Sequence, residues 1–455
     1  MTVDGPRPRG SVTPVPNPSV SVDIAVVGGG PAGMAAAVSA RAAGASVAVI
    51  ERYPAVGGQI YRRAFDETPA SLPRAGRRWA RNLAASGALV LTDTAVWGVR
   101  DPHTLLTESA GPRAGTVRAR AMVLATGAYD RPVAFPGWTL PGVMTAGAAQ
   151  ALVKAQSTLP GRRVLLAGAG PFLLPVATQL RAAGAEVVAV AEATSRRRWA
   201  SAAPRMLAHP ARLAAYGRYR ARLPGVRFLW GHLLVRVDGD GRAERATLAA
   251  VDDRWRPRPG SERTFEVDAV CTAYGFVPAL ELARALGCEL AGDAVAHDAD
   301  MRTSVPHVYV AGEAAGVGGA DLAVLEGSAA GRAAAGAAIP AAIDRRRRHG
   351  VRFARLLDTL FAPGPGLAEL ARADTVLCRC EDVRAGEVDA AVAAGATSLS
   401  AVKIATRCGQ GPCQGRMCES LVAARLAAPS RYSTRVPLRP VAVTTLLDDV
   451  TADPS

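Results

Sequence analysis

The chain has 455 residues, of which 49% are apolar and 5% aromatic, and its formal net charge is +15. This length allows two or three domains that each bury a core, and the wealth of small aliphatic residues suits α/β layers rather than an all-β or disordered chain. The basic runs at residues 195–199 and 345–350 are short, so the positive charge is interpreted as solvated surface and not as a nucleic-acid interface.

The N-terminal residues 1–20 are predicted to be a disordered leader, because they are rich in proline and lack the apolar stretch of a signal peptide. No uninterrupted apolar run approaches the roughly 18 residues that a membrane span needs. Together these features predict a cytoplasmic protein without a transmembrane segment. In a reducing compartment, clustered cysteines more often bind metal or do redox chemistry than form structural disulfides.

The first strong motif lies at residues 22–51 and predicts a dinucleotide site. An apolar strand, a G-x-G-x-x-G pattern, an alanine-rich helix, a second apolar strand and an acid follow one another in the order that this site requires. The glycines allow a tight turn, close approach to a pyrophosphate, and packing of the helix on the strand, while the helix N-terminus faces the phosphates. The residues expected to bind the cofactor are Gly28, Gly30, Gly33, Glu51 and the adjacent Arg52.

Three later segments favour FAD over NAD at this first site. They resemble the "GGQ" segment, the A-T-G turn and the second FAD motif of flavoproteins with two dinucleotide-binding domains. That resemblance implies backbone approach to the flavin ring, and a hydrogen bond from the acid of the last motif to the ribityl chain. Most members carry Asp at that acid, and this chain carries Glu. The corresponding residues are Gly58, Gln59, Thr126, Gly127, Gly312 and Glu313.

A second strand–glycine–helix–strand–acid pattern at residues 163–193 predicts an inserted NAD(P)-type domain. Gly168, Gly170 and Glu192 fit the pattern, and the acid would favour NAD by binding the ribose 2′-hydroxyl. The third glycine position is Leu173, however, and the arginines at 196–198 would also accept a 2′-phosphate. A working NAD(P) site and a fold relic that no longer turns over are therefore both open.

No pair of closely spaced cysteines precedes residue 378. Cys271 and Cys288 stand alone in apolar surroundings and are interpreted as packing residues. Dithiol chemistry of the thioredoxin-reductase kind is therefore not expected, and electrons that leave the flavin need another acceptor.

Five cysteines cluster at residues 378–418 and predict an iron–sulfur centre. In the spacing C-x-C-x₃₂-C-x₄-C, four thiolates suit a [2Fe–2S] cluster, and the glycine-rich segment between them leaves backbone N–H groups free for the sulfurs. Zinc is the rival, but structural zinc sites usually pair C-x₂₋₄-C knuckles. The expected ligands are Cys378, Cys380, Cys413 and Cys418, with Cys408 either a neighbour or a replacement for Cys418.

The predicted fold class is α/β: a Rossmann-type, glutathione-reductase-like flavoprotein with two dinucleotide-binding domains and a small helical [2Fe–2S] domain. The expected division is a leader at 1–20, an FAD-binding domain at 21–158 plus 296–343, an NAD(P)-binding-like domain at 159–295, a linker at 344–374, the [2Fe–2S] domain at 375–430 and a tail at 431–455.

The quoted motifs, together with "ATGAYDRPVAFPGWTLPGVMTAGAAQAL" and "TRCGQGPCQGRMC", resemble a known family. It comprises the FAD/NAD-binding subunits of multi-subunit amino- and imino-acid dehydrogenases, and its C-terminal unit is similar to bacterioferritin-associated ferredoxin. The resemblance implies that a separate β-type flavin subunit oxidises the amine, and that the present chain passes electrons onward, with a further partner in a small ferredoxin-like subunit. The alternatives are a self-contained NAD(P)H-dependent ferredoxin-type reductase and a non-enzymatic docking or redox-sensing module. The residues themselves show no acid/base constellation for a substrate.

Overall fold

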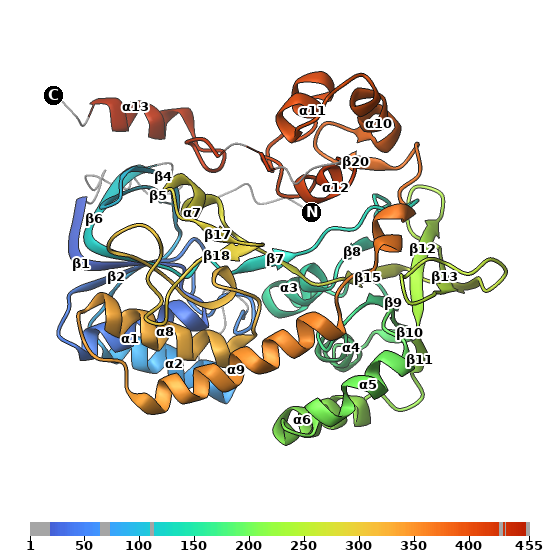
Figure 1. Cartoon of the computed structure of the whole chain (residues 1–455), viewed down its shortest axis with the longest axis horizontal. Helices are drawn as coiled ribbons and strands as arrows, with labels where there is room; N and C mark the ends of the chain where they lie inside the picture. Colours follow the sequence, from blue (N-terminus) through green and yellow to red (C-terminus); the bar gives the residue numbers. More distant parts are fainter. Residues whose placement is uncertain (1–18, 64–72, 110–112, 427–430, 433, 452–455) are drawn as a thin grey trace, which may run out of the picture.

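The first domain is built on a sheet whose centre is the strand that leads into the first glycine motif. The computed structural model describes residues 19–63, 73–109, 113–426, 431–432 and 434–451. Within them the strands run in the order β3-β2-β1-β6-β5-β4, and β19 pairs with the end of β6 (Figure 1). The bounds are β1 (Ser19–Val27), β2 (Val47–Ile50), β3 (Leu89–Leu91), β4 (Thr94–Asp101), β5 (Thr104–Ser109), β6 (Arg113–Leu124) and β19 (Val308–Val310). Most of the predicted leader lies outside the described residues.

Two helices on one face of this sheet pack at unusually close range. They are α1 (Pro31–Ala42) and α8 (Ala320–Ala334), with α2 (Arg74–Ala85) beside α1. A Cβ added at Gly327 or at Gly331 would lie 2.1 Å from the backbone oxygen of Ala32 or Ala36, respectively. Only glycine at these two positions therefore lets α8 pack this closely against α1, the helix that follows the first glycine motif.

This close approach makes a stability prediction. Gly331→Ala is expected to destabilise the protein by about 1–3 kcal/mol, because the new methyl group overpacks the contact with Ala36. The measurement is the free energy of unfolding from denaturant titration of the FAD-bound protein. The control is Gly217→Ala in helix α6 (Pro210–Ala221), where nothing lies within 4 Å of the added Cβ. There the helix propensity of alanine should stabilise by about 0.5–1 kcal/mol. Equal effects of the two substitutions would contradict the packing argument.

The second domain contains a parallel sheet in the order β11-β10-β9-β15-β8, backed by a three-stranded antiparallel sheet. The strands are β8 (Val143–Thr145), β9 (Arg163–Gly168), β10 (Glu186–Glu192), β11 (Arg227–Trp230), β12 (His232–Asp238), β13 (Arg245–Ala250), β14 (Arg263–Glu266) and β15 (Ala269–Ala273). The helices are α3 (Ala146–Gln156), α4 (Leu173–Ala182), α5 (Arg196–Met206) and α6. Strand β8 belongs to this sheet and α3 packs against it, although the predicted boundary at 158 placed both with the first domain. The reason is that β8 covers the open edge of β15.

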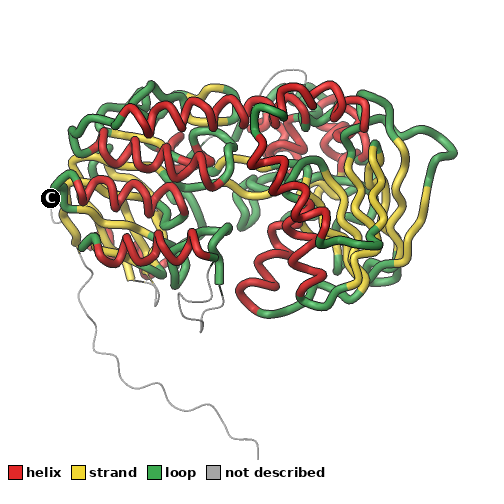
Figure 2. Tube along the Cα trace, turned by 90° about the horizontal axis from the view of Figure 1, so that it is seen from below, coloured by secondary structure: helices red, strands yellow, loops and turns green. Residues whose placement is uncertain are grey.

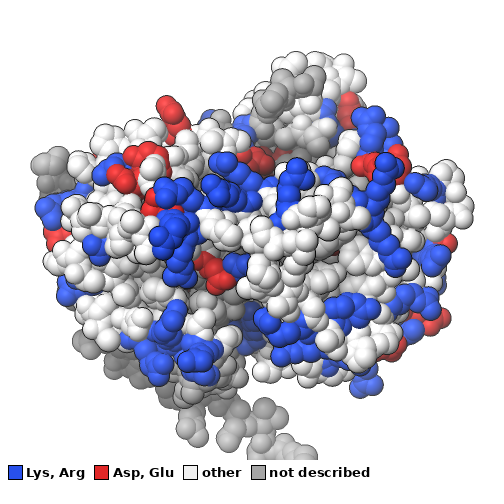
Figure 3. Space-filling model, turned by 60° about the horizontal axis from the view of Figure 1, so that its bottom comes forward, with Lys and Arg blue, Asp and Glu red and all other residues white. Residues whose placement is uncertain are grey.

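Two connections join the domains, one built from short strands and one helical. A two-stranded ladder pairs β7 (Ala128–Asp130) with β16 (Phe276–Pro278), and α7 (Glu281–Ala285) and the hairpin β17 (Leu290–Ala291)–β18 (Ala294–Val295) follow it. The predicted linker is mostly helical: α9 (Ala341–Leu360) runs from the first domain to the second (Figure 1), and η3 (Pro365–Leu370) follows it. In Figure 2 the strands form two separate groups with helices packed around them. Arginines of α9 contribute to the basic surface visible in Figure 3, and Arg345, Arg346 and Arg348 are exposed.

The cysteine domain, residues 375–426, sits above the junction of the other two. It contains β20 (Val376–Cys378), β21 (Val383–Arg384), α10 (Ala385–Ala393), α11 (Leu399–Thr406) and α12 (Glu419–Ala423). The chain then returns to the first domain: Leu438 donates its N–H to the carbonyl of Trp97, and Glu108 accepts from Ala442 and Thr445. The terminal helix α13 (Val443–Thr451) thus lies over the antiparallel strands of the first sheet (Figure 1).

Candidate cofactor sites

The first glycine loop, residues 28–33, has the shape that a pyrophosphate requires. Gly28 has φ +105°, and a Cβ there would lie 2.2 Å from the oxygen of Ala125. A Cβ on Gly33 would lie 1.8 Å from the oxygen of Gly28, so the helix can begin at Pro31 only with glycine at that position. Gly30 differs, because an added Cβ would meet only the Cα of Gly58, at 3.8 Å. Its open side is the space that a phosphate would fill.

Glu51 directly follows β2, at the place that the motif predicts, and it is buried. Its carboxylate accepts the N–H of Gly29 at 2.8 Å and the N–H of Tyr53 at 2.9 Å, which fixes the acid beside the glycine loop. Next to it opens a hollow of about 420 Å³, lined by Arg52, Tyr53, Asp93, Ala95, Glu108, Ser109 and Arg439. The polar walls and the position of this hollow suit the adenosine end of a dinucleotide.

The segments expected around the flavin ring gather at the other end of the loop. Gly57 donates its N–H to the carbonyl of Gly29 at 2.8 Å, which brings Gly58 and Gln59 against the glycine loop. Thr126 and Gly127 follow β6 directly, and the Thr126 hydroxyl donates to the carbonyl of Ala279 at 2.7 Å. The GGQ segment therefore lies against the first glycine loop, and the A-T-G turn lies just past the carboxyl end of β6, the strand that pairs with β1.

Glu313 lies in the short turn η2 (Gly312–Ala314), after β19. Its carboxylate accepts the N–H of Gly319 at 2.9 Å, and burial raises its pKa to about 7. The side chain is thus directed to its own loop, and contact with a ribityl chain stays a prediction. Beneath it the buried Glu326 of α8 accepts the N–H of Gly312 at 3.0 Å.

The second glycine loop, residues 168–173, departs from the first. Gly168 is held by its neighbour, since a Cβ there would lie 2.1 Å from the oxygen of Ala273. The helix begins at Leu173 rather than directly after the second glycine, and that leucine is fully buried. A side chain at this third glycine position cannot sit where Gly33 sits in the first site. The positive φ falls on the second glycine here, Gly170 with φ +106°, whereas in the first loop it falls on the first glycine, Gly28.

Glu192 occupies the predicted place at the end of β10. It accepts N–H groups from Gly170 at 3.0 Å and Thr194 at 2.9 Å, and burial raises its pKa to about 7. A shallow hollow of about 380 Å³ lies at the end of β11, lined by Arg196, Phe228, Leu229, Trp230 and His232.

An aromatic side chain covers the second glycine loop. Phe361, the residue that ends α9, places its ring 3.6 Å from the position of a Cβ on Gly170. The ring also packs edge-to-face on Trp199 with centroids 5.4 Å apart. Arg198 donates to the carbonyls of Thr359, at 2.5 Å, and Ala362, at 3.4 Å, which pins this end of α9. Phe361 thus packs against the second glycine loop at an ordinary van der Waals distance from Gly170.

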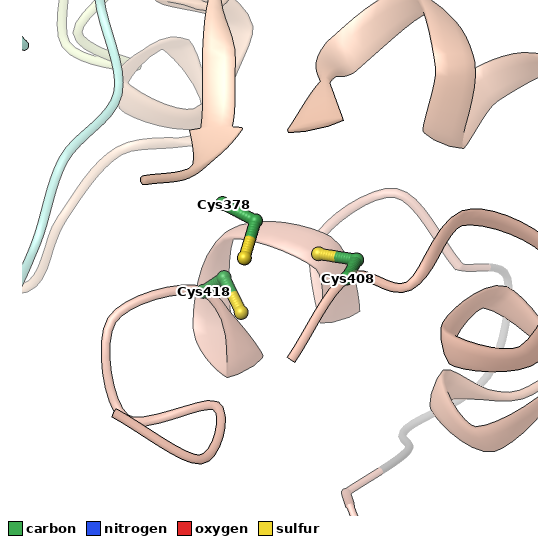
Figure 4. A group of neighbouring side chains, drawn as sticks. All are labelled: Cys378, Cys408 and Cys418. Carbon is green, nitrogen blue, oxygen red and sulfur yellow. The ribbon is translucent and has the colours of Figure 1, made fainter. Parts of the chain in front are cut away.

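The cysteines form two groups in the structure. The sulfurs of Cys378, Cys408 and Cys418, the buried trio, lie within 4.8 Å of one another (Figure 4). Hydrogen bonds from Cys408 and then Cys418 lower the pKa of Cys378 to about 2. Cys380 is exposed and Cys413 is half-buried, and these two interact with each other beside the trio. The predicted set of four is therefore divided, and Cys408 is brought in with two of its members.

The residues present fit both cofactors. An open glycine loop, a buried acid and a polar hollow suit an FAD-type dinucleotide. Five thiols within one small domain supply more than the four thiolates that a [2Fe–2S] cluster takes.

Sequence reasoning missed two residues beside these sites. Lys154 in α3 donates to the carbonyls of Gln59 and Ile60, and burial lowers its pKa to about 8. Its rarity was a usable signal, because only two lysines occur in the chain. Tyr432 packs against Gly409 and Gly415, and its hydroxyl donates to the carbonyl of Cys408 at 3.1 Å. No spacing rule links this tyrosine to the cysteines.

Two families match the chain. Residues 22–335 match the pyridine nucleotide-disulphide oxidoreductase family, and residues 376–428 match the BFD-like [2Fe-2S] binding domain. The predicted cofactor domains, one for FAD and NAD and one for a [2Fe–2S] cluster, are therefore confirmed. Among the described residues, no helix is both long and apolar enough to cross a membrane.

The similar proteins are oxidoreductase subunits. The A subunit of opine oxidase from Rhizobium meliloti is 37% identical over 462 residues, which cover 94% of this chain and 98% of that protein. The HcnB subunit of hydrogen cyanide synthase from Pseudomonas aeruginosa is 34% identical over 456 residues, 91% of this chain and 96% of that protein. The resemblance predicted from the motifs is thus confirmed, and the relatives' names mark them as parts of larger assemblies.

Solved structures confirm the fold class. L-proline dehydrogenase from P. horikoshii matches with a TM-score of 0.66 at 21% identity, covering 96% of this chain and 81% of that one. Thioredoxin reductase from T. acidophilum matches 70% of this chain with a TM-score of 0.50, also at 21% identity. The chain therefore belongs to the pyridine nucleotide-disulphide oxidoreductase family, carries a BFD-like [2Fe–2S] binding domain, and is related to HcnB and to the A subunit of opine oxidase.

Proposed function

We propose that this protein is the electron-transfer subunit, carrying FAD and a [2Fe–2S] cluster, of a multi-subunit FAD-dependent amino- or imino-acid dehydrogenase. Similarity over nearly the whole chain to subunits of opine oxidase and hydrogen cyanide synthase supports this role. In this assignment a β-type flavin subunit oxidises the C–N bond of the donor, and a small ferredoxin-like subunit is a further partner. The first glycine loop, Glu51 and Glu313 bind FAD, and Cys378, Cys380, Cys413 and Cys418 ligate the cluster.

The observation that carries the proposal is the covered second glycine loop. A reductase that is reduced by NADH needs an open pyrophosphate site beside the flavin domain, and here Phe361 lies over Gly170. Leu173 in place of the third glycine removes the usual helix start as well. In this proposal electrons enter from a partner subunit rather than from a nicotinamide.

The electron balance fits a relay. Oxidation of an amine to an imine releases two electrons and two protons, and the protons leave to solvent. FAD accepts electrons in pairs and a [2Fe–2S] cluster passes them singly. Each substrate molecule therefore requires two passages through the cluster to a one-electron acceptor.

The second candidate is a self-contained NAD(P)H-dependent reductase. The position of Glu192 favours it, because this acid ends β10 beside the second glycine loop. The hollow at Trp230 and His232 lies where β11, the strand that pairs with β10, passes into β12, and it would give an adenosine some room. For this function, the ring of Phe361 would have to leave the loop.

An anaerobic titration with NADH separates the two functions. We expect NADH to leave the flavin and cluster absorbance of the purified chain unchanged, whereas dithionite bleaches both and gives the EPR signal of a reduced cluster. The physical reason is the altered second loop, in which Leu173 replaces the third glycine and Phe361 packs against Gly170. Rapid bleaching by NADH would overturn the relay assignment in favour of the reductase.

The variant Phe361→Ala tests whether the ring is the obstacle. We expect quenching of NADH fluorescence to appear only in this variant, with the absorbance of FAD and cluster retained. Phe353→Ala is the matched control, since it removes a ring from the same helix that packs on His209 and not on the glycine loop. Equal NADH binding by the wild type and Phe361→Ala would show that the ring closes nothing.

A further inference from the structure

Arg416 lies in the cysteine loop between Cys413 and Cys418, but its side chain extends to α7, which packs on the first domain. Its guanidinium pairs with Glu281 of α7, with Nε 2.5 Å from the carboxylate Oε1. It also donates to the carbonyl of Leu438 in the returning tail at 2.9 Å and to the carbonyl of Cys413 at 3.3 Å. One side chain thus joins a cysteine loop, the tail and the first domain.

The partner helix α7 is itself fixed to the predicted flavin site. Ala279, two residues before Glu281, donates its N–H to the carbonyl of Gly127 at 2.9 Å and accepts the hydroxyl of Thr126 at 2.7 Å. The β7–β16 ladder continues this attachment. The A-T-G turn, Ala279, Glu281 and Arg416 therefore form one bonded connection that ends at the cysteine loop.

A second, reversed ion pair lies beside the first. Arg284 of α7 lies 3.6 Å from the carboxylate of Glu419, the residue after Cys418, and it also donates to the carbonyl of Tyr432. The four charged side chains are only 19–29% exposed. Ion pairs at this depth are screened less by solvent than surface pairs are, and removing one partner leaves a poorly solvated charge.

Tyr129 of β7 lies beneath these pairs. Burial is the main cause that raises the pKa of its phenol, and the carboxylates of Glu281 and Glu419 raise it further. The guanidinium groups of Arg416 and Arg284 lower it. Only two residues separate this tyrosine from Thr126 along the chain. The ion pairs thus close over the short segment that runs from the A-T-G turn toward the cysteine domain.

We propose that Arg416 is a positioning residue that holds the cysteine domain in one fixed register on α7. Because α7 is bonded to the A-T-G turn, this register also sets the distance between the two cofactor-bearing domains. The docking of the cysteine domain on α7 is inferred only from the ion pairs and hydrogen bonds described above. Its consequence for electron transfer rests on the proposed function.

Hydrogen exchange of the full-length, cofactor-loaded chain tests the docking. In Glu281→Gln, which leaves the cysteine loop itself intact, we expect backbone amides of 276–285 and 413–422 to exchange about 5- to 30-fold faster. Arg416→Gln should do the same or more, and Arg416→Lys should recover part of the protection. The matched control is Arg256→Gln, which removes a bidentate pair with Glu369 between the second domain and η3. It should leave both segments unchanged.

Transfer between the cofactors gives the second readout. After photoreduction, the appearance of the reduced-cluster EPR signal should slow severalfold in Glu281→Gln, because electron transfer falls steeply with the distance between the two centres and the variant no longer fixes that distance. The FAD content and the EPR line shape should stay those of the wild type.

If both segments of Glu281→Gln exchange as slowly as in the wild type, the docking proposal is overturned, whether or not NADH bleaches the wild-type protein. Faster exchange with an unchanged transfer rate would overturn the link between docking and transfer. Bleaching of the wild type by NADH would instead remove the proposed function and leave the docking result standing.

Discussion

Serine at Cys378, Cys380, Cys413 or Cys418, introduced one at a time, is expected to abolish the [2Fe–2S] cluster, whereas Cys408→Ser should retain it. Loss of one of four thiolates leaves an iron without its ligand, so the effect is close to all-or-none. The measurement is the iron and sulfide content per chain, with the visible absorbance and the EPR spectrum of the reduced sample. Cys408→Ser should shift the reduction potential, because its sulfur lies within 4.8 Å of Cys378 and Cys418.

The buried trio defines the contrary outcome. If Cys408→Ser loses the cluster and either Cys380→Ser or Cys413→Ser keeps it, the trio supplies three of the ligands and the C-x-C-x₃₂-C-x₄-C set is wrong. Cys271→Ser is the control for general damage, because this buried cysteine lies in β15, far along the chain from the cysteine domain. It should leave the cluster content unchanged.

Glu326→Gln is expected to make the protein more stable than wild type at alkaline pH and no different at pH 4. Burial raises the pKa of Glu326 from 4.5 to about 8, even though the carboxylate accepts the N–H of Gly312. The folded state therefore holds a proton that the unfolded chain releases above pH 4.5. Stability contributed by this group is full below pH 4.5, falls between pH 4.5 and 8, and stays low above that range. Glutamine is neutral throughout and can keep the hydrogen bond.

The difference in unfolding free energy between the variant and wild type should thus grow to on the order of 4 kcal/mol by pH 9. Denaturant titrations of the FAD-bound protein at a series of pH values measure it. Glu289→Gln, at an exposed site, is the control and should show no such growth. A constant difference across the range would mean that Glu326 is already ionised in the folded protein near pH 5.

Local sequence was sufficient for the two glycine loops. The order of strand, glycines, helix, strand and acid forces a tight turn at Gly28 and at Gly168, because in each case a Cβ would overlap a backbone oxygen of a neighbouring strand. Glu192 ends its strand and Glu51 directly follows its strand, as the pattern predicts, and both carboxylates accept N–H groups of their glycine loops. These contacts are local to one βαβ unit, so short-range spacing encodes them.

The sequence predicted only part of the structure of the second glycine loop. The sequence showed that the third glycine is missing, and it left a working site and a relic open. The covering ring decides the geometry, yet Phe361 stands 191 positions after Gly170 and arrives through α9, a helix expected to be a linker. No spacing between them exists to be read.

The cysteine domain divides in the same way. Residue types and spacing determined that the C-terminal unit binds a [2Fe–2S] cluster, because thiolate number and softness select the metal centre. Which thiols face one another depends on how β20, the loop before α12 and Tyr432 pack, and this packing placed Cys408 beside Cys378.

By itself, then, the sequence determined the α/β flavoprotein architecture, the two cofactors and the family, since each follows from short motifs with fixed backbone requirements. Only the tertiary structure decided that Phe361 covers the second glycine loop, that Arg416 ties a cysteine loop to α7, and that the tail returns to the first sheet. These contacts join segments far apart in the chain, and their free energy comes from packing and charge pairing that arise only when the domains have assembled.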